Sequence, residues 1–268
     1  EAFGSDEKEL AQQLTEALFS HVQDPKIKEN EGIPAHLQKH ALCFMTLIVA
    51  MESKALFGKT YQSVLDDCLY KSLYVFANDE LQAPFEYVGK DGKPVLQGEG
   101  RLIDPGHTLE SLWFAMHTGQ QENNDAYKKR AKTILNWVLR LGWDPVYGGF
   151  YQYVDVQKGV PEDRFLYNSY DGFPVAWDDK IWWVQAEGLY TLLLSSLLNG
   201  EENHFSYFLR LHDFTQKFFM DKTVGEWNSI CQRNGTVKDG RKGFALKGPY
   251  HVMRAYVQMV QVLEKALE

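Results

Sequence analysis

Apolar residues recur at helical spacing in one segment after another of this 268-residue chain. Leucine, valine, isoleucine and aromatic side chains return every three or four positions, which is the pattern of helices that bury one face. This periodicity predicts an all-α fold of helical hairpins, with short β-hairpin inserts between some of the helices. The predicted helices span residues 5–23, 34–52, 60–77, 105–116, 124–141, 178–198, 202–219 and 249–268.

Glycine-rich and aromatic inserts separate several of these helices. Residues 85–88 and 94–96 are predicted to form two strands around a turn at 90–92, and residues 225–243 a strand–turn–strand unit. Residues 143–151 indicate a turn that leads into a short aromatic strand, and 161–174 an irregular polar segment. If the helices form a ring, the polar helix starts that follow the inserts meet at one end, where we expect a functional site.

Charge and hydropathy exclude several classes of partner. The formal net charge is −8 and the sequence pI is about 5.5, and no run of lysine or arginine outweighs this balance. We therefore expect neither a nucleic acid nor an anionic membrane as partner. No stretch reaches about 18 consecutive apolar residues, so no membrane span is predicted, and no signal peptide opens the chain.

The cysteines and the short motifs indicate neither a metal site nor a disulfide framework. Cys43, Cys68 and Cys231 lack the spacing of either, and Cys43 and Cys68 fall within apolar helical patterns as small core residues. This favours a reducing, cytoplasmic location. The sequence holds no HExxH, paired CxxC, GxSxG or phosphate-loop motif, so no metal is expected.

The start of the helix at residue 105 carries a candidate proton-transfer pair. Asp104 can cap this helix, and Pro105 then falls at the first helical position, where its missing N–H costs nothing. His107 and Glu110 are three residues apart and share a face. A neighbouring glutamate can orient a histidine and favour its charged form, which suits proton transfer near neutral pH. The alternative is that the histidine only caps or packs.

Other helix starts carry further candidates. His251 could act on the opposite face of a planar intermediate from His107, although sequence spacing does not show whether the two face each other. Trp183 and Glu187 are four residues apart, so an indole could stack on a sugar while a carboxylate binds its hydroxyls. Arg101 could hydrogen-bond a substrate oxygen. Core or surface roles are the alternative for each.

Taken together, these residues resemble the signature of the N-acylglucosamine 2-epimerase (renin-binding protein) superfamily. The similarity lies first in the block from Gly100 to Phe114, which includes Asp104-Pro105-Gly106-His107. It continues in register through blocks at 142–149, 180–187 and 225–254. The resemblance implies a single (α/α)6-barrel domain over residues 1–268, with helices in two concentric rings and a site at the mouth of the inner ring.

The predicted helices match only the last eight of the twelve that this resemblance implies. The first two hairpins of the barrel, with an arginine near the reacting carbonyl, have no counterpart in the sequence. An incomplete ring would expose apolar edges unless something covers them. Three explanations stay open: the chain is a fragment of a longer protein, the rest of the barrel sits elsewhere, or the arc forms a homodimer.

The resemblance also implies a chemistry. A histidine removes the proton at C2 of an open-chain sugar, an enediolate-like intermediate forms, and a second histidine returns the proton to the opposite face. His107 and His251 match these two bases, and Glu110 matches the acid that supports the first. The family requires no cofactor, although a nucleotide such as ATP could be an allosteric effector. The positions matching substrate ligands are Arg101, Lys180, Trp183, Glu187 and Arg254.

Among sugars, the resemblance favours N-acetyl-D-glucosamine and N-acetyl-D-mannosamine. Relatives that act on mannose-type sugars or cellobiose carry an additional histidine on the helix corresponding to residues 41–52, and residues 42–48 contain none here. The alternatives are an aldose–ketose isomerase or another epimerase of the superfamily, and a non-catalytic α-toroid that binds a sugar or a protein.

Overall fold

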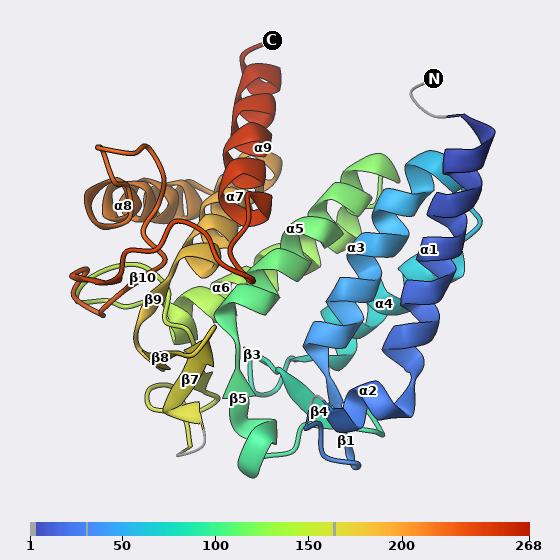
Figure 1. Cartoon of the computed structure of the whole chain (residues 1–268), viewed down its shortest axis with the longest axis horizontal. Coiled ribbons are helices and arrows are strands. Elements are labelled where there is room, and N and C mark those ends of the chain that lie inside the picture. The colour runs from blue at the N-terminus through green and yellow to red at the C-terminus, as the bar shows by residue number, and fades with distance from the viewer. Residues whose placement is uncertain (1–3, 31, 163–164) are drawn as a thin grey trace.

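The computed structural model describes residues 4–30, 32–162 and 165–268. Within these residues the fold is mostly helical, as the periodicity predicts, and the helices that follow one another along the chain form hairpins (Figure 1). The helices are α1 (Ser5–Gln23), α2 (Pro25–Asn30), α3 (His40–Phe57), α4 (Gln62–Tyr70), α5 (Pro105–Gln121), α6 (Asp125–Gly142), α7 (Trp182–Asn199), α8 (Glu202–Phe218) and α9 (Tyr250–Leu267).

Helices α3, α5, α7 and α9 pack side by side, each against the next, and form an inner arc. Outer helices cover it: α4 packs on α3, α6 on α5, α8 on α7, and α1 on the far side of α3. Alternation of inner and outer helices is the arrangement of an (α/α) barrel. A large apolar core fills the space between the two layers, and it includes the fully buried indoles of Trp113, Trp182 and Trp227.

Exposed apolar side chains mark both ends of the arc. Leu10, Leu14 and Leu18 lie on one face of α1 and are about half exposed. At the other end, Met253 and Val257 are similarly exposed on α9. This confirms the expectation that the predicted helices leave apolar edges uncovered. Among the described residues, α3 is apolar enough over its length to cross a membrane, with a mean hydropathy of 1.4, yet it lies within the arc between α4 and α5.

Short antiparallel ladders join the inserts to one another. The pairs are β1 (Leu37–Lys39) with β4 (Tyr87–Gly89), β2 (Ala77–Asn78) with β3 (Ala83–Pro84), β5 (Leu102–Ile103) with β6 (Val154–Asp155), β7 (Tyr167–Tyr170) with β8 (Phe173–Ala176), and β10 (Ile230–Cys231) with both β9 (Lys180–Ile181) and β11 (Val237–Asp239). Three pairings connect segments that lie far apart in the sequence, β1 with β4, β5 with β6 and β9 with β10, and they lead directly into the starts of α3, α5 and α7. The other pairings are local hairpins.

These ladders correct several predicted boundaries. The helix predicted from residue 34 begins at His40, because residues 37–39 pair with β4. The helix predicted from residue 178 begins at Trp182, because residues 180–181 pair with β10. Residues 94–96 are not a strand. For both helix starts the partner strand lies more than 40 residues away along the chain, where a local pattern gives no signal.

Two further corrections concern single segments. Residues 161–174 are not irregular throughout, because residues 167–176 form the β7–β8 hairpin, with Asp171 and Gly172 at positive φ in its turn. The helix predicted over 60–77 ends its α-helical part at Tyr70 and continues as a π-helical turn, Lys71–Val75. The strand–turn–strand unit within residues 225–243 is confirmed.

Candidate active site

The start of α5 has the predicted geometry. Asp104 is the N-cap, and its Oδ1 accepts the backbone N–H of His107 at 3.1 Å, with Pro105 at the first helical position. Gly106 follows, and a Cβ at this position would lie 2.4 Å from the ring of Trp183. The glycine therefore allows the indole of α7 to lie directly against the first turn of α5.

His107 contacts two buried carboxylates. Its Nδ1 lies 3.0 Å from Oε2 of Glu86 and 3.1 Å from Oδ2 of Asp104. Both acids are almost fully buried, whereas the imidazole is 23% exposed. The carboxylate that hydrogen-bonds to the His107 imidazole is therefore that of Glu86, in the insert before α5. It is not that of Glu110, as the helical spacing predicts. Glu86 is held by its backbone, because its N–H donates to Leu102 O and its carbonyl accepts from His40 N.

These acids determine the protonation of His107. Burial alone lowers the pKa of an imidazole, but the charges of Asp104 and Glu86 outweigh it and raise the pKa of His107 to about 9. Burial raises the pKa of Asp104 to about 6, with Glu86 adding to the effect and His107 opposing it. Burial acts in the same direction on Glu86, yet the neighbouring His107 holds its pKa below the usual value. At neutral pH His107 thus carries a proton that it can donate through Nε2.

His251 forms the second histidine–glutamate pair. Its Nδ1 lies 2.5 Å from Oε1 of Glu187, and its side chain is 20% exposed. Glu187 is fully buried and also accepts hydrogen bonds from Trp113 Nε1, at 2.8 Å, and from the guanidinium of Arg254. Burial opposes ionisation of Glu187, but His251 and Arg254 together hold its pKa below the usual value.

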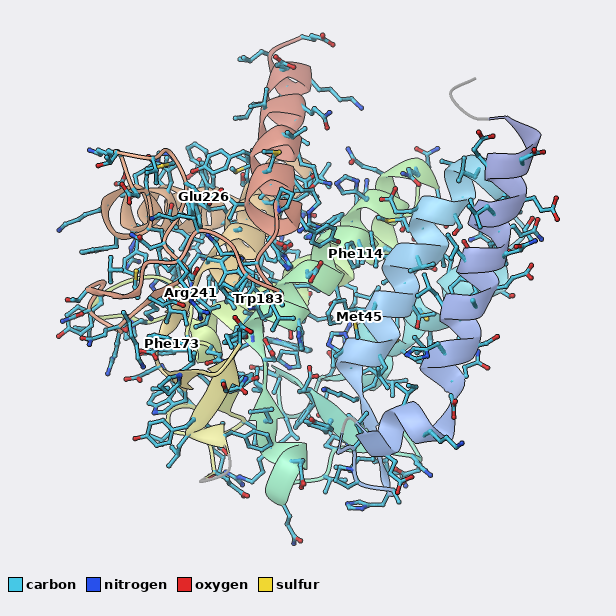
Figure 2. All side chains as sticks on the ribbon, viewed as in Figure 1. Met45, Phe114, Phe173, Trp183, Glu226 and Arg241 are labelled. Carbon is cyan, nitrogen blue, oxygen red and sulfur yellow. The ribbon has the colours of Figure 1, made fainter. Side chains whose placement is uncertain are left out.

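Trp183 lies between the two histidines. The centroid of its ring is 5.4 Å from that of His107 and 5.5 Å from that of His251. Figure 2 labels Trp183 near the middle of the molecule, where the starts of α5, α7 and α9 meet. Both imidazoles thus contact one indole, and in each the Nδ1 atom is engaged by a carboxylate. This leaves Nε2 as the atom on which each ring can exchange a proton.

Glu110 lies on the His251 side of the site. Its Oε1 accepts a hydrogen bond from the hydroxyl of Tyr250 at 3.3 Å and is 3.7 Å from the guanidinium of Arg254. Burial and the nearby charge of Glu187 raise the pKa of Glu110 to about 7. Glu110 is therefore poised to change charge near neutral pH, in contact with Tyr250 and Arg254 instead of His107.

Two predicted substrate ligands are engaged in ion pairs within the fold. The guanidinium of Arg101 binds Asp155 through two hydrogen bonds, of 2.9 and 2.6 Å, and so fastens β5 to β6. The side chain of Lys180 has no exposed surface, and its Nζ lies 3.2 Å from Oδ2 of Asp144 and 4.1 Å from the centre of the Tyr151 ring. Burial lowers the pKa of Lys180 to about 8, although Asp144 opposes this. Both cations are thus paired with acids of the fold, and Lys180 has no exposed surface from which to reach a sugar.

His40 is a residue that the sequence did not single out. It is buried at the start of α3, with its ring 5.6 Å from Phe44, and Phe44 in turn lies 5.0 Å from His107. Neither ring nitrogen has a hydrogen-bond partner among the described residues. Burial lowers the pKa of His40 to about 4, with Glu86 opposing, so the ring is neutral at neutral pH. His40 and Phe44 are four apart on an apolar face, a signal of packing and not of chemistry.

Two sets of side chains could each offer three ligand atoms to a metal ion. One is Glu86, Asp104 and His107, and the other is Glu110, Glu187 and His251; within each set the ligand atoms lie within 4.8 Å of one another. In the second set the guanidinium of Arg254 already binds Glu187, and its positive charge opposes a cation there. Both sets are equally well described as carboxylates that orient an imidazole.

Comparisons with known proteins agree with this fold. The profile of the N-acylglucosamine 2-epimerase (GlcNAc 2-epimerase) family matches residues 5–255. The N-acylglucosamine 2-epimerase of Mus musculus is 28% identical over 211 residues, which is 78% of this chain and 47% of the mouse protein. A D-mannose isomerase of Marinomonas mediterranea is 25% identical over 188 residues, 70% of this chain and 43% of its own length.

A solved sugar epimerase from a ruminal bacterium has the same fold. It superimposes with a TM-score of 0.68 at 14% identity, over 84% of this chain and 54% of its own. The chain thus spans about half the length of the curated relatives and of the solved structure that it matches.

Proposed function

The chain belongs to the N-acylglucosamine 2-epimerase family, and on this basis we propose that it carries the catalytic histidines of a sugar 2-epimerase that interconverts N-acetyl-D-glucosamine and N-acetyl-D-mannosamine. The observation that carries the proposal is the pair of histidine–glutamate contacts, His107 with Glu86 and His251 with Glu187, on either side of Trp183. Two oriented imidazoles next to one aromatic surface are what proton transfer to opposite faces of a sugar carbon requires.

In the proposed reaction one imidazole removes the proton at C2 of the open-chain sugar, and an enediolate-like intermediate forms. The other imidazole returns a proton to the opposite face. His107 is suited to the donating step, because its two carboxylates keep it protonated at neutral pH, and removal of the C2 proton then falls to His251. In the reverse direction the two roles exchange. Each positioned acid or base typically contributes ~10²–10⁴-fold in rate.

Negative charge that develops on the sugar oxygen needs a nearby donor or cation. Arg254 supplies a positive charge on the His251 side, where its guanidinium stacks 4.5 Å from the centre of the Trp113 ring and 4.2 Å from that of Tyr250. In the proposed site Arg254 stabilises the enediolate oxygen while it stays anchored on Glu187. Trp183 provides the apolar surface on which the sugar's C–H groups stack.

A second candidate is an aldose–ketose isomerase acting on a mannose-type sugar. It is supported by the match to a D-mannose isomerase and by His40, a histidine that lies immediately before residues 42–48 and one aromatic ring from His107. The N-acetyl sugars remain our first choice because the curated relative from mouse, at 28% identity, is named for them. Both candidates share proton removal at C2 and differ in where the proton returns.

The test is proton exchange in deuterated water. Either N-acetyl sugar is incubated with the chain, and NMR follows deuterium at C2 and the appearance of the other epimer. We expect both signals in the wild-type chain and loss of epimerisation in His107→Ala and in His251→Ala. His212→Ala is the matched control, because His212 lies exposed on α8. A ketose product from mannose with no N-acetyl epimerisation would favour the isomerase, and sugar binding without any exchange would leave only a binding protein.

A further inference from the structure

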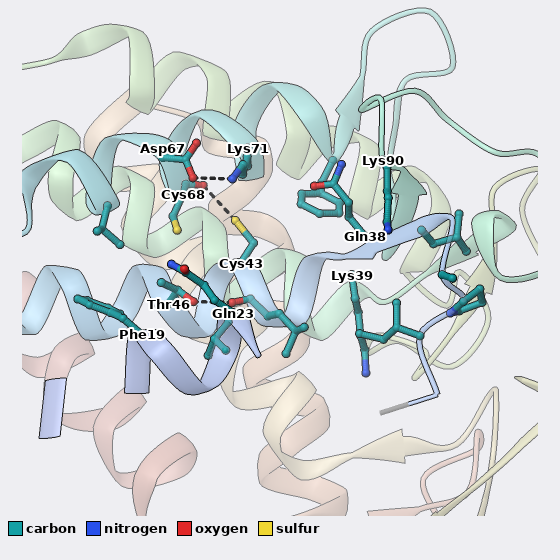
Figure 3. Close-up of a pocket in the computed structure, with 18 of the residues that line it drawn as sticks. Phe19, Gln23, Gln38, Lys39, Cys43, Thr46, Asp67, Cys68, Lys71 and Lys90 are labelled. Atoms are coloured by element: carbon teal, nitrogen blue, oxygen red, sulfur yellow. Dashed lines mark hydrogen bonds and ion pairs between the residues drawn. The ribbon is translucent and has the colours of Figure 1, made fainter. Parts of the chain in front are cut away.

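A cavity of about 1000 Å³ lies among α1, α3 and α4, separate from the two histidine–glutamate pairs (Figure 3). Two thiols line it, Cys43 from α3 and Cys68 from α4, together with the lysines Lys39, Lys71 and Lys90. The sequence pattern predicts that both cysteines are small core residues. In the structure Cys68 belongs to the core and Cys43 packs against it, as that pattern predicts. Both also line the wall of the cavity, and the Cys43 thiol contacts the backbone of Cys68.

The two thiols are neighbours across the α3–α4 interface. The thiol of Cys43 donates to the backbone carbonyl of Cys68 at 3.5 Å and lies 3.7 Å from the hydroxyl of Ser72. Figure 3 shows the two sulfur atoms next to each other between the helices. Cys43 is partly exposed and Cys68 is buried. The pair therefore has one accessible sulfur with a second directly behind it.

The surroundings favour charge on one of the two sulfurs. The interaction with the Cys68 side chain lowers the pKa of Cys43, and Ser72 and the Lys71 ammonium add to this effect; burial opposes it, as does Asp67, the ion-pair partner of Lys71. The interaction with Cys43, together with burial, raises the pKa of Cys68. Lys71 and Ser72 both belong to the π-helical turn Lys71–Val75, and such turns recur at functional sites.

Cys231 provides an internal contrast. It is a fully buried residue of β10, and burial raises the pKa of its thiol to about 12. Reactive cysteines are partly exposed thiolates in electropositive surroundings, often with a second cysteine nearby that resolves the oxidised form. Cys43 with Cys68 fits this description, and Cys231 does not.

We propose that Cys43 and Cys68 form a hydroperoxide-reactive dithiol that closes to an intramolecular disulfide. The Cys43 thiolate attacks an oxygen of the hydroperoxide, the O–O bond breaks, and the departing oxygen takes up a proton and leaves as water or an alcohol. Cys43 is then a sulfenic acid. The sulfur of Cys68 attacks it, the S–S bond forms, and the hydroxyl leaves as water with the proton of Cys68. Two thiols lose two electrons, and the peroxide gains them.

This proposal is independent of the proposed sugar chemistry. In a reducing compartment such a disulfide is transient and is reversed by thiols, which is the behaviour of redox-sensing pairs. Its location also bears on the candidate site. Cys43 directly precedes Phe44, whose ring lies 5.0 Å from His107, so the new bond would fasten α3 to α4 one residue from that contact.

The test uses the reduced 268-residue chain and an equimolar amount of hydrogen peroxide. We expect intact mass to show the loss of two hydrogens, and peptide mapping without reductant to show one disulfide, between Cys43 and Cys68 of the same chain. Dithiothreitol should reverse both changes. In Cys68→Ser the reaction should stop at the sulfenic acid, which dimedone traps on Cys43, and in Cys43→Ser the thiol of Cys68 should survive.

Two further variants keep the result interpretable. Cys231→Ser should oxidise like the wild-type chain, and Lys71→Met should slow the loss of thiol several-fold while thermal unfolding shows that it remains folded. The proposal is overturned if the folded chain forms no disulfide under these conditions. It is also overturned if the disulfide joins two chains, or if Cys231 reacts as fast as Cys43.

Discussion

The two histidines of the candidate site are held in opposite ways. His107 contacts two acids, Glu86 and Asp104, and both reach the same ring nitrogen. On the other side a single acid, Glu187, binds three donors, from His251, Trp113 and Arg254. One imidazole thus has an excess of negative charge around it, whereas the carboxylate that binds the other is shared with a permanent cation.

This difference shows how one fold can give two like groups unlike tasks. The excess of carboxylates raises the pKa of His107 and keeps its proton in place. Sharing Glu187 with Arg254 leaves less net negative charge beside His251. The two halves also differ in origin, because Glu86 comes from an insert 21 residues before His107, and Glu187 from the neighbouring helix α7.

The largest expected effect is loss of either imidazole. We predict that His107→Ala and His251→Ala each lower kcat for epimerisation by ~10²–10⁴-fold. Each variant keeps one base, so it should still exchange the C2 proton of one epimer. The epimer that His107→Ala exchanges should be the opposite of the one that His251→Ala exchanges. Deuterium incorporation measured separately from each pure epimer tests this. Exchange from both epimers in either variant would contradict the division between two faces.

Replacing Glu187 and Glu86, one at a time, tests most directly whether the two histidines are held in different ways. Glu187→Gln leaves Arg254 with only its longer contact to Glu110, so we expect a loss of about 3–5 kcal/mol in unfolding free energy, as for other broken buried pairs. Glu86→Gln should be milder, because Asp104 still contacts His107. Urea unfolding of both variants, with kcat measured at a temperature where both are folded, tests this. Equal destabilisation would mean that the two acids play the same part.

The pH dependence should sharpen the comparison. The active form of the two histidines together holds one proton. For both directions of epimerisation, kcat/KM should therefore fall as pH rises through about 9, the raised pKa of His107. Folding stability that comes from this raised pKa is fully present below about 6.5 and is lost as pH rises through about 9. Glu86→Gln removes one negative charge and should move the upper limb of the profile to lower pH. If the upper limb of the profile does not move in Glu86→Gln, a group other than His107 is responsible for it.

The smallest expected effect on catalysis concerns Lys180. Since its ammonium is buried against Asp144, Lys180→Met should lower stability by about 1–3 kcal/mol, with the loss limited because Arg233 also binds Asp144. KM for the sugar should stay unchanged. Thermal unfolding and steady-state kinetics together test this. A large rise in KM without a change in stability would restore Lys180 as a substrate ligand.

Local patterns predicted the parts of the site that belong to helices. The cap at Asp104, the position of His107 on α5 and the shared helical face of Trp183 and Glu187 follow from spacing along one helix, and the structure has all three. The resemblance to a known family selected His251, which spacing alone could not connect to His107.

The features of the site that the sequence did not predict depend on contacts between distant segments. Glu86 reaches His107 only because backbone hydrogen bonds hold its insert between α3 and β5, and nothing in its local sequence marks it. Arg101 and Lys180 were predicted as ligands from the family resemblance. Their ion pairs were not predicted, because the partners, Asp155 and Asp144, lie 54 and 36 residues away. A charged side chain can be assigned to a substrate only once such partners are placed.

The close packing of Gly106 against Trp183 has a consequence for sequence variation. Even a methyl group at residue 106 would overlap the indole, so a larger residue there can be accommodated only if the ring at 183 becomes smaller or moves. The two positions should therefore vary together across homologous chains, although 77 residues separate them in this one. A homologue that has lost both the glycine and the tryptophan would have rebuilt the surface between its histidines, and a change of substrate would be sought there first.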